Sequence, residues 1–378
     1  MQCPDPKWPG AEEYMAEFVT KAERLHIPLT GSLELTHRCN LDCVHCYLGP
    51  RAGREALGDS EIGAARMHLL IDEITEAGCL NLLITGGEPL LREDFPEIYR
   101  HAKENGLLVT VFTNGTIITD DITGLFCDLP PLEVEISVYG ATAPVYESIT
   151  RVRGSFERCM EGIRSLLDRG IRVNLKTILM TMNRHEYAAI ENIARELGVR
   201  FRFDAAVSPR LDGDNGPLSL RVSPEEAIEN EISGSGKAQT WTKFFEKYKD
   251  CTLGAELYGC GAGLSLFHVD PFGQLSPCMM ALDIKHDISA AGFSAGWKNI
   301  TPRIRDKKAG TDFGCKGCLK INFCGYCPGF FRLENGREDA PSEYLCRMGG
   351  LRFEYVQNMM KGDQSGRSEK NSSEAAIY

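Results

Sequence analysis

The sequence has neither an excess of basic residues nor a long apolar run. Its 378 residues include 42 lysines and arginines against 53 aspartates and glutamates, a formal net charge of −11. Such a charge offers no basic surface to nucleic acid or to an anionic membrane, so we expect neither as a partner. The N-terminus lacks the charged start and apolar core of a signal peptide, and no apolar run reaches bilayer length. We therefore expect a cytoplasmic protein.

Cysteine, by contrast, is abundant. The chain has 15 cysteines in an otherwise ordinary globular composition, with 43% hydrophobic and 25% charged residues. A reducing compartment disfavours structural disulfides, so clustered thiols there indicate metal ligands or catalytic groups. The spacing of the cysteines is therefore the main evidence on function.

The pattern of predicted elements divides the chain into five segments. Residues 1–30 form an N-terminal helical extension, and residues 31–208 alternate strands with amphipathic helices, which is typical of βα units. We expect strands at 33–36, 81–85, 107–113, 132–138, 172–180 and 200–205, and helices at 59–77, 93–105, 120–127, 155–169 and 184–197. Six units are too few for an eight-stranded barrel, so we predict an α/β fold with a partial (β/α)6 TIM-like barrel. Its chemistry should lie at the carboxyl ends of the strands.

The alternation stops after the barrel. Residues 209–250 are predicted to be a linker or bridging region, because their first part is rich in proline, glycine and aspartate. Residues 251–361 contain eight cysteines and many glycines, which favours a small cysteine-rich domain stabilised by metal clusters. Residues 362–378 are polar and are predicted to be a disordered tail.

A first cysteine cluster directly follows the first predicted strand. Cys39, Cys43 and Cys46 have the spacing C-x3-C-x2-C. A structural zinc site uses four protein ligands, whereas three thiolates on a 4Fe-4S cluster leave one iron open. The alternative is a zinc knuckle that takes its fourth ligand from His37, His45 or a distant cysteine.

This triplet, followed by the aromatic Tyr47 and by Gly86-Gly87-Glu88-Pro89 after the second predicted strand, resembles the radical S-adenosylmethionine (SAM) enzymes. The resemblance covers roughly residues 31–206. It implies that the three cysteines hold a 4Fe-4S cluster whose open iron binds the methionine part of SAM. An electron from the cluster would cleave SAM to a 5'-deoxyadenosyl radical, which abstracts hydrogen from a substrate.

The resemblance also implies positions for SAM contacts. The glycine-rich segment would contact the amino group of the methionine, Ser137 the ribose hydroxyls, and Arg151 the carboxylate; the full set is Tyr47, Gly86, Gly87, Glu88, Pro89, Asn114, Ser137 and Arg151. Alternatively, Ser137 is a cap at a strand end and Asn114 a turn residue. Lys176 and Asp204, on the fifth and sixth strands, are candidate catalytic residues or a structural ion pair.

A second cluster of seven cysteines follows in the order Cys260-x12-Gly273-x4-Cys278 and Cys315-x2-Cys318-x5-Cys324-x2-Cys327-x18-Cys346. Zinc ribbons are the structural alternative. The arrangement resembles the SPASM extension of radical SAM enzymes, which carries two auxiliary 4Fe-4S clusters and would make three clusters in this chain. The resemblance assigns Cys315, Cys318, Cys324 and Cys346 to the outer cluster, and Cys260, Cys278 and Cys327 to the nearer one, with Cys251 as candidate fourth ligand. The spacing departs from the common pattern between Cys324 and Cys327, where two residues replace three.

Enzymes with this pair of domains mostly modify peptides, so the resemblance implies a ribosomal peptide or protein substrate. The expected change is a thioether or carbon–carbon crosslink, or a side-chain oxidation. Thirty residues before the first strand are too few for a winged-helix recognition domain, so leader recognition would need a separate partner protein. The electron donor would be a flavodoxin or a ferredoxin. Two alternatives stay open: a decarboxylase of haem or haem d1 synthesis, and a non-catalytic iron-sulfur or zinc scaffold.

Overall fold

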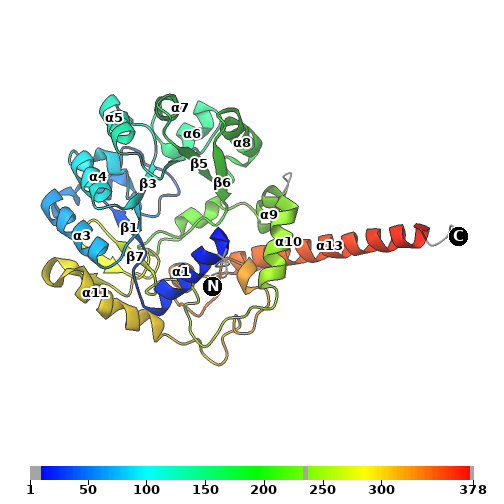
Figure 1. Ribbon diagram of the computed structural model, residues 1–378. Helices are drawn as coiled ribbons and strands as arrows, with labels where there is room; N and C mark the ends of the chain where they lie inside the picture. Colours follow the sequence, from blue (N-terminus) through cyan, green and yellow to red (C-terminus); the bar gives the residue numbers. More distant parts are fainter. Residues whose placement is uncertain (1–9, 233–236, 375–378) are drawn as a thin grey trace, which may run out of the picture. The chain divides into compact units, whose positions relative to one another are not determined.

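The computed structural model describes residues 10–232 and 237–374 (Figure 1). The chain forms two compact units, and it passes between them several times. Unit 1 comprises Met1–Thr177, His185–Phe203 and Cys260–Asp306; unit 2 comprises Ile178–Arg184, Asp204–Gly259 and Lys307–Tyr378. The predicted boundaries at 208 and 251 differ from this division, because the predicted cysteine-rich segment is shared between the two units.

A nine-stranded sheet in the order β6-β5-β4-β3-β2-β1-β7-β8-β9 is the centre of unit 1. Each of the six predicted strands is present: β1 (Thr30–Glu34), β2 (Asn81–Thr85), β3 (Leu108–Thr113), β4 (Glu133–Ser137), β5 (Val173–Ile178) and β6 (Arg200–Asp204). Strands β1 to β5 pair in parallel along the sheet. The predicted α/β fold class is confirmed.

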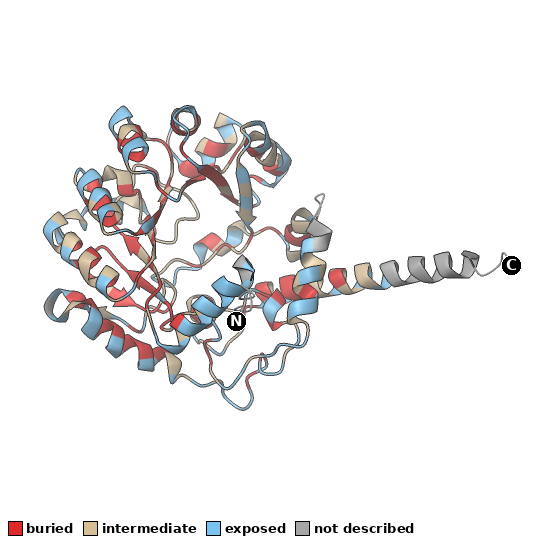
Figure 2. Ribbon diagram, viewed as in Figure 1, coloured by how far each residue is buried: buried red, intermediate tan, exposed pale blue. Residues whose placement is uncertain are grey.

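Helices cover the outer face of this sheet (Figure 1). They are α3 (Ala64–Glu76), α4 (Phe95–Glu104), α5 (Asp120–Asp128), α7 (Ser155–Asp168) and α8 (Tyr187–Glu196), close to the predicted ranges. Two short helices in loops were not predicted, α2 (Arg51–Glu55) and α6 (Ala143–Thr150). Side chains alternate across each strand, and one face carries buried apolar residues such as Leu33, Ile84 and Leu175. Figure 2 shows buried segments along the strands of the sheet. The other face carries the polar side chains that matter for the site.

Residues 260–306 extend this sheet, which the sequence did not indicate. β7 (Leu266–Val269) pairs in parallel with β1, and β8 (Gln274–Ser276) and β9 (His286–Asp287) follow as antiparallel strands. Gly31 of β1 makes room for the ring of Phe267, because a Cβ at Gly31 would lie 2.1 Å from that ring. The helix α11 (Ile288–Arg305) then follows β9. A four-residue strand between glycines has too little periodicity to be recognised, and long-range pairing creates it.

Unit 2 is mainly helical. Its elements are η4 (Gly216–Leu220), α9 (Pro224–Ile232), α10 (Lys237–Tyr248), η5 (Ile321–Phe323), α12 (Pro328–Asn335) and α13 (Glu343–Glu374). The buried core cluster of this unit consists of Phe245 of α10, Phe323 of η5 and Val356 of α13. The predicted linker 209–250 therefore contains two helices of this unit, and Arg352 of α13 forms an ion pair with Glu231 of α9 at 2.8 Å.

The two ends of the chain also allow comparison with prediction. The helix α1 (Ala11–Arg24) occupies the predicted N-terminal extension, of which residues 1–9 lie outside the described residues. Residues 362–374, predicted to be disordered, instead continue α13, and 375–378 lie outside the described residues. Polar composition alone does not oppose a helix in a segment without proline. None of the described helices is long and apolar enough to cross a membrane.

Candidate functional site

The first three cysteines lie together in the loop that leaves the carboxyl end of β1. The amides of Asp42 and Val44 donate to the carbonyls of Thr150 and Ile149 at the end of α6, each at 3.0 Å. The loop is thus fixed from the side by main-chain hydrogen bonds. Within it, the amide of Cys46 donates to the carbonyl of Cys43 at 3.1 Å, which makes a tight turn between two of the thiols.

Burial and mutual repulsion set the pKa values of these thiols. Burial raises the pKa of Cys39 to about 11 and raises that of Cys43 well above its ordinary value, and neighbouring thiols of the triplet raise the pKa of both. The buried guanidinium of Arg54 opposes both shifts. Within the part of the chain that the structure describes, no three His, Cys, Asp or Glu side chains are arranged around a position for a single metal ion. The three thiols are nevertheless electrostatic neighbours, which fits ligands of one multi-iron group.

Glu34, the last residue of β1, anchors both ends of this loop. Its carboxylate oxygens are 2.8 Å from His37 Nε2, before the first cysteine, and 2.6 Å from Tyr47 Oη, after the third. A third partner is His268 of β7, whose Nε2 is 3.7 Å away. Although burial raises the pKa of Glu34, the hydrogen bond from His37 and the charge of His268 hold it below its ordinary value. The hydroxyl of Tyr47 is therefore engaged with the protein, and a contact of Tyr47 with SAM stays a prediction.

Gly86 and Gly87 follow β2, and their main chain packs against the segment that leads from β1 into the cysteines. The amide of Gly87 donates to the carbonyl of Thr36 at 2.7 Å. A Cβ at Gly86, where φ is +136°, would lie 2.3 Å from the Thr36 oxygen, and one at Gly87 would lie 2.2 Å from the Arg38 oxygen. Both positions require glycine because the protein's own backbone approaches closely. The predicted contact of this segment with the methionine amino group stays a prediction.

The next residue, Glu88, is fully buried and connects β2 to β3. Its carboxylate accepts hydrogen bonds from Thr113 Oγ1 at 2.8 Å, from the amide of Asn114 at 2.7 Å and from the amide of Leu90 at 3.2 Å. Burial raises the pKa of Glu88 to about 7. Pro89 begins the short η2 turn (Pro89–Leu91) and is buried as well. The side chain of Glu88 thus holds strand ends together.

The structure brings Asn114 and Arg151 to the cysteine loop. Asn114 Nδ2 is 2.8 Å from Asn40 Oδ1 and 3.8 Å from Cys39 Sγ. Arg151 ends α6 with a left-handed conformation, and its Nη1 is 3.9 Å from Asp42 Oδ2. Its side chain is largely exposed, and a contact of Arg151 with SAM stays a prediction.

Two partly buried aromatic residues lie near the thiols: Tyr139, which the sequence analysis did not single out, and His45, which it named only as an alternative zinc ligand. Tyr139 follows β4 and hydrogen-bonds Ser137; burial and the nearby Cys43 raise the pKa of Tyr139. Its ring meets that of His45 edge to face, with centroids 4.6 Å apart. Burial lowers the pKa of His45 to about 4, and His45 Nδ1 has no hydrogen-bond partner among the described residues. A buried, unsatisfied acceptor or donor beside three thiols fits a site built for a polar ligand.

The two candidate catalytic residues have separate partners. Lys176 of β5 lies 3.1 Å from Glu135 of β4. Asp204 is exposed, and its Oδ1 accepts a hydrogen bond from the amide of Ala206 at 2.8 Å. The structure thus pairs Lys176 with Glu135, a residue that the sequence analysis did not single out.

The four cysteines predicted for the outer auxiliary cluster lie together in unit 2. Burial raises the pKa of Cys315 to about 11, and the charges of Cys346 and Cys318 add to it. Burial raises the pKa of Cys324 to about 12, and the charges of Cys346, Cys315 and Cys318 add to the shift. Gly349 of α13 packs on Cys324, since a Cβ there would lie 2.4 Å from the Cys324 Cβ. These positions bring four thiols within electrostatic range of one another.

The ligands predicted for the nearer auxiliary cluster are divided between the units. Cys260 and Cys278 belong to unit 1, and Cys251 and Cys327 to unit 2. Cys327 caps α12, where its Sγ accepts from the amide of Phe330 at 3.4 Å. This ligand set stays a prediction.

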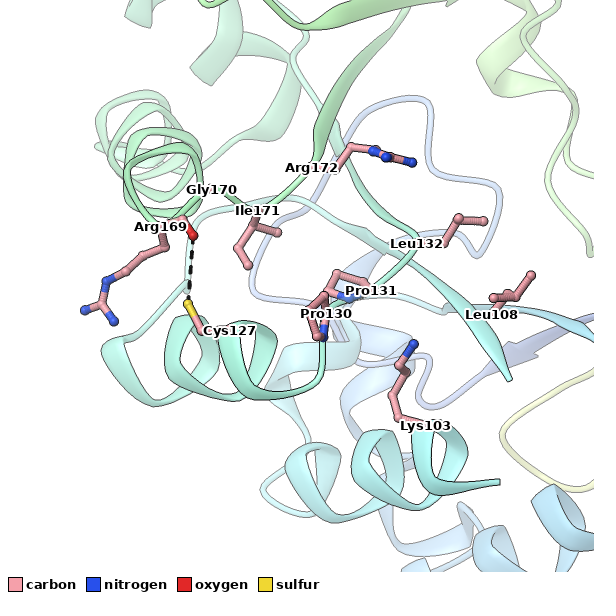
Figure 3. A pocket seen from close by; sticks show the side chains of 10 residues that line it. All are labelled: Lys103, Leu108, Cys127, Pro130, Pro131, Leu132, Arg169, Gly170, Ile171 and Arg172. Atoms are coloured by element: carbon pink, nitrogen blue, oxygen red, sulfur yellow. Dashed lines mark hydrogen bonds between the residues drawn. The ribbon is translucent and has the colours of Figure 1, made fainter. Parts of the chain in front are cut away.

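A pocket of unit 1 lies at the opposite end of the sheet (Figure 3). It is lined by the starts of β3 to β5 and the helix ends beside them, including Leu108, Leu132 and Arg172. The cysteine loop, by contrast, follows the carboxyl end of β1. This pocket is therefore separate from the site described above.

Comparison with known proteins identifies the family. A model of the radical SAM superfamily matches residues 33–197. An AdoMet-dependent heme synthase of Methanosarcina barkeri is 33% identical over 297 residues, covering 72% of this chain and 83% of the relative. The chain belongs to the radical SAM superfamily. Membership implies that SAM and a 4Fe-4S cluster are its cofactors, and that it is an enzyme.

Two further similarities connect this radical SAM chain to other proteins. The mycofactocin maturase MftC of Mycobacterium tuberculosis is 28% identical over 313 residues, covering 79% of this chain and 78% of the relative. The crystal structure of Streptococcus suis SuiB bound to precursor peptide SuiA has a TM-score of 0.65 at 16% identity, covering 92% of this chain and 84% of SuiB. The likeness to SuiB extends over both units and concerns the fold.

Proposed function

We propose that this radical SAM enzyme abstracts hydrogen from a ribosomal peptide or protein and thereby crosslinks or oxidises it. The observation that carries this proposal is the second group of thiols, Cys315, Cys318, Cys324 and Cys346, assembled in a unit outside the barrel. Similarity in fold to SuiB, which was crystallised with a precursor peptide, supports a peptide substrate over a small molecule.

Within unit 1, each group of residues has a distinct task. Cys39, Cys43 and Cys46 would hold the 4Fe-4S cluster, which together with bound SAM supplies the 5'-deoxyadenosyl radical. Glu34 fixes both ends of the cysteine loop, and Gly86 and Gly87 hold the start of the loop against β2. Ser137, at the end of β4, is proposed to bind the ribose.

Two auxiliary 4Fe-4S clusters complete the proposal and bring the number of clusters to three. Cys315, Cys318, Cys324 and Cys346 would hold one, and Cys260, Cys278 and Cys327 the other, with Cys251 as fourth ligand. These clusters would accept the electron that an oxidised substrate radical leaves behind. A flavodoxin or ferredoxin is proposed to reduce the enzyme, and a separate protein to recognise the leader of the substrate.

The first test is cluster content with SAM cleavage. After anaerobic reconstitution, the wild-type chain should hold about twelve irons and, with dithionite and SAM, form 5'-deoxyadenosine. Cys43→Ala should lose the cleavage and about four irons, whereas Cys318→Ala should lose a similar amount of iron but keep part of the cleavage. Mass spectrometry of 5'-deoxyadenosine and iron analysis read both outcomes. Cleavage at the wild-type rate by Cys43→Ala would place the SAM site elsewhere, and zinc in place of iron would favour the scaffold alternative.

A small-molecule decarboxylase is the second candidate, favoured by the heme synthase relative at 33% identity. To discriminate between the two candidates, the reconstituted enzyme is incubated with peptides encoded near its gene and, in a separate reaction, with iron coproporphyrin. A mass change in a peptide supports the proposal. Loss of carbon dioxide from the porphyrin, with no peptide product, would replace it by the decarboxylase.

A further inference from the structure

One guanidinium is buried against the cysteine loop. Arg54 belongs to the short helix α2, which follows the third cysteine, and it is only 3% exposed. Its Nη1 donates to the carbonyl of His37, before the first cysteine, at 3.1 Å. Its Nε donates to the carbonyl of Pro50, after the third cysteine, at 3.4 Å. Arg54 therefore connects the two ends of the segment that carries all three thiols.

The charge of Arg54 acts on the thiols rather than on a carboxylate. Both of its hydrogen bonds end on main-chain carbonyls, and no carboxylate among the described side chains forms an ion pair with it. Burial raises the pKa of Cys39 and of Cys43, and the charge of Arg54 opposes both shifts. The carboxylates of Glu88 and Asp42 add to these shifts, one at each thiol. Arg54 is thus a cation that the two thiols share, and its charge stabilises their anionic state.

Arg51 of the same helix provides the contrast. Its side chain is 42% exposed, and its Nε lies 3.2 Å from Glu55 Oε1, which is itself largely exposed. Solvent and salt screen such a pair, so its field at a distance is weak. The field of a buried guanidinium is screened far less. One short helix therefore carries one surface ion pair and one buried cation beside the thiols.

Reduction of a 4Fe-4S cluster changes its charge. One electron enters the cluster, its net charge becomes more negative by one, and the thiolate ligands stay bound. Net charge, hydrogen bonding and solvent exposure set the potential of this step. A fixed positive charge in a poorly solvated place stabilises the reduced state more than the oxidised state. Because a guanidinium keeps its proton in proteins, the contribution of Arg54 is permanent.

We propose that the buried charge of Arg54 raises the reduction potential of the 4Fe-4S cluster in the cysteine loop. The inference rests on the proposed function, because that proposal assigns the cluster to these three thiols. Arg54 acts through its charge, and it makes electron transfer from the flavodoxin or ferredoxin to this cluster more favourable. The two hydrogen bonds to the loop hold the guanidinium in place for this task.

A redox titration followed by electron paramagnetic resonance tests the proposal. It uses the reconstituted full chain without SAM, and the signal of interest is the one that Cys43→Ala lacks. Arg54→Gln keeps a donor for the loop but loses the charge. Its equilibrium constant for reduction should fall about tenfold, which lowers the potential by about 59 mV for one electron. Arg54→Lys keeps the charge but loses the planar fork of donors, and it should recover most of the difference.

Arg51→Gln is the matched control, and it should leave the potential unchanged. An unchanged potential in Arg54→Gln would overturn the proposal. So would equal falls in Arg54→Gln and Arg54→Lys, which would show that Arg54 only shapes the loop. Iron analysis covers variants that fail to hold the cluster, with Arg54→Met as a second neutral variant. Iron retained by Arg54→Lys but lost from both neutral variants supports the role of the charge, and iron lost from all three overturns it.

Failure of the proposed function has a different signature. If Cys43→Ala removes no signal, the cysteine loop does not hold the cluster, and both the assignment and the role of Arg54 are rejected. If Cys43→Ala removes the signal but Arg54→Gln leaves its potential unchanged, only the role of Arg54 is rejected. The potential is measured without SAM cleavage, so the result does not depend on the identity of the substrate.

Discussion

Single carboxylates determine the geometry around the cysteine loop. Glu34 contacts the residues on both sides of the cysteine triplet, and Glu88 connects the ends of β2 and β3. A buried carboxylate is costly unless every oxygen has donors. Because both carboxylates have several donors, they act as rigid connections between segments. The spacing of Cys39, Cys43 and Cys46 could be recognised in the sequence, whereas the partners of Glu34 lie on a distant strand and in a loop.

Lys176 provides a pH-dependent test at this scale. Its pKa falls from an ordinary value of 10.5 to about 8 in the folded protein. Between these values the native state has released a proton that the unfolded chain still binds, so stability rises as pH rises from about 8 to about 10.5. Relative to Lys176→Met, the wild-type free energy of unfolding should gain up to about 3 kcal/mol over this range. Anaerobic urea unfolding of both apoproteins measures the difference, and a difference independent of pH would contradict the lowered pKa.

At the scale of elements, the end of β2 is held against the segment that follows β1 because their main chains pass very close to each other. The end of β2 passes so close to Thr36 that no side chain fits at Gly86. The boundaries of β2 agree with the prediction, because a short apolar run between Gly78 and Gly86 specifies them locally. The approach of β2 to the segment before the cysteines was not predictable, since it depends on which strands become neighbours.

Gly86→Ala tests this approach, with Gly106→Ala as its matched control. Both glycines have positive φ, +136° at Gly86 and +81° at Gly106, but a Cβ at Gly106 would meet nothing within 4 Å. Gly106→Ala should cost about 1–2 kcal/mol of stability through backbone strain alone. Gly86→Ala must also displace the Thr36 carbonyl, so it should cost more and reduce 5'-deoxyadenosine formation. Urea unfolding and mass spectrometry measure the two effects, and equal losses in both variants would show that crowding at Gly86 is unimportant.

At the scale of the whole molecule, the chain order does not match the division into units. Residues 260–306 lie in the cysteine-rich part of the sequence but supply β7, β8 and β9 to the sheet of unit 1. β7 covers the edge of β1, and its His268 belongs to the group around Glu34. The second half of the chain therefore helps to build the site whose cysteines lie in the first half.

Truncation tests this dependence. A chain ending at residue 208, the boundary predicted from the sequence, leaves the edge of β1 unpaired and removes the Phe267 ring from Gly31. Exposed strand edges and apolar surface promote aggregation, so this chain should be mainly insoluble. A chain ending at residue 306 retains β7 to β9 and should be markedly more soluble, with slower hydrogen exchange in β1. Equal solubility of the two chains would mean that unit 1 is stable without its last three strands.

The sequence by itself determined the local features: the six strands from β1 to β6, most of the helices between them, and the two groups of cysteines. These follow from hydrophobic periodicity and from spacing along the chain, which need no information about distant segments. Only the tertiary structure decided that β7 pairs with β1, that Glu34 contacts His37 and Tyr47 together, and that Lys176 and Arg202 share Glu135. Each of these pairings depends on the register and neighbours of strands far apart in the chain. Local periodicity specifies which face a residue occupies, but strand order and register determine what it meets there.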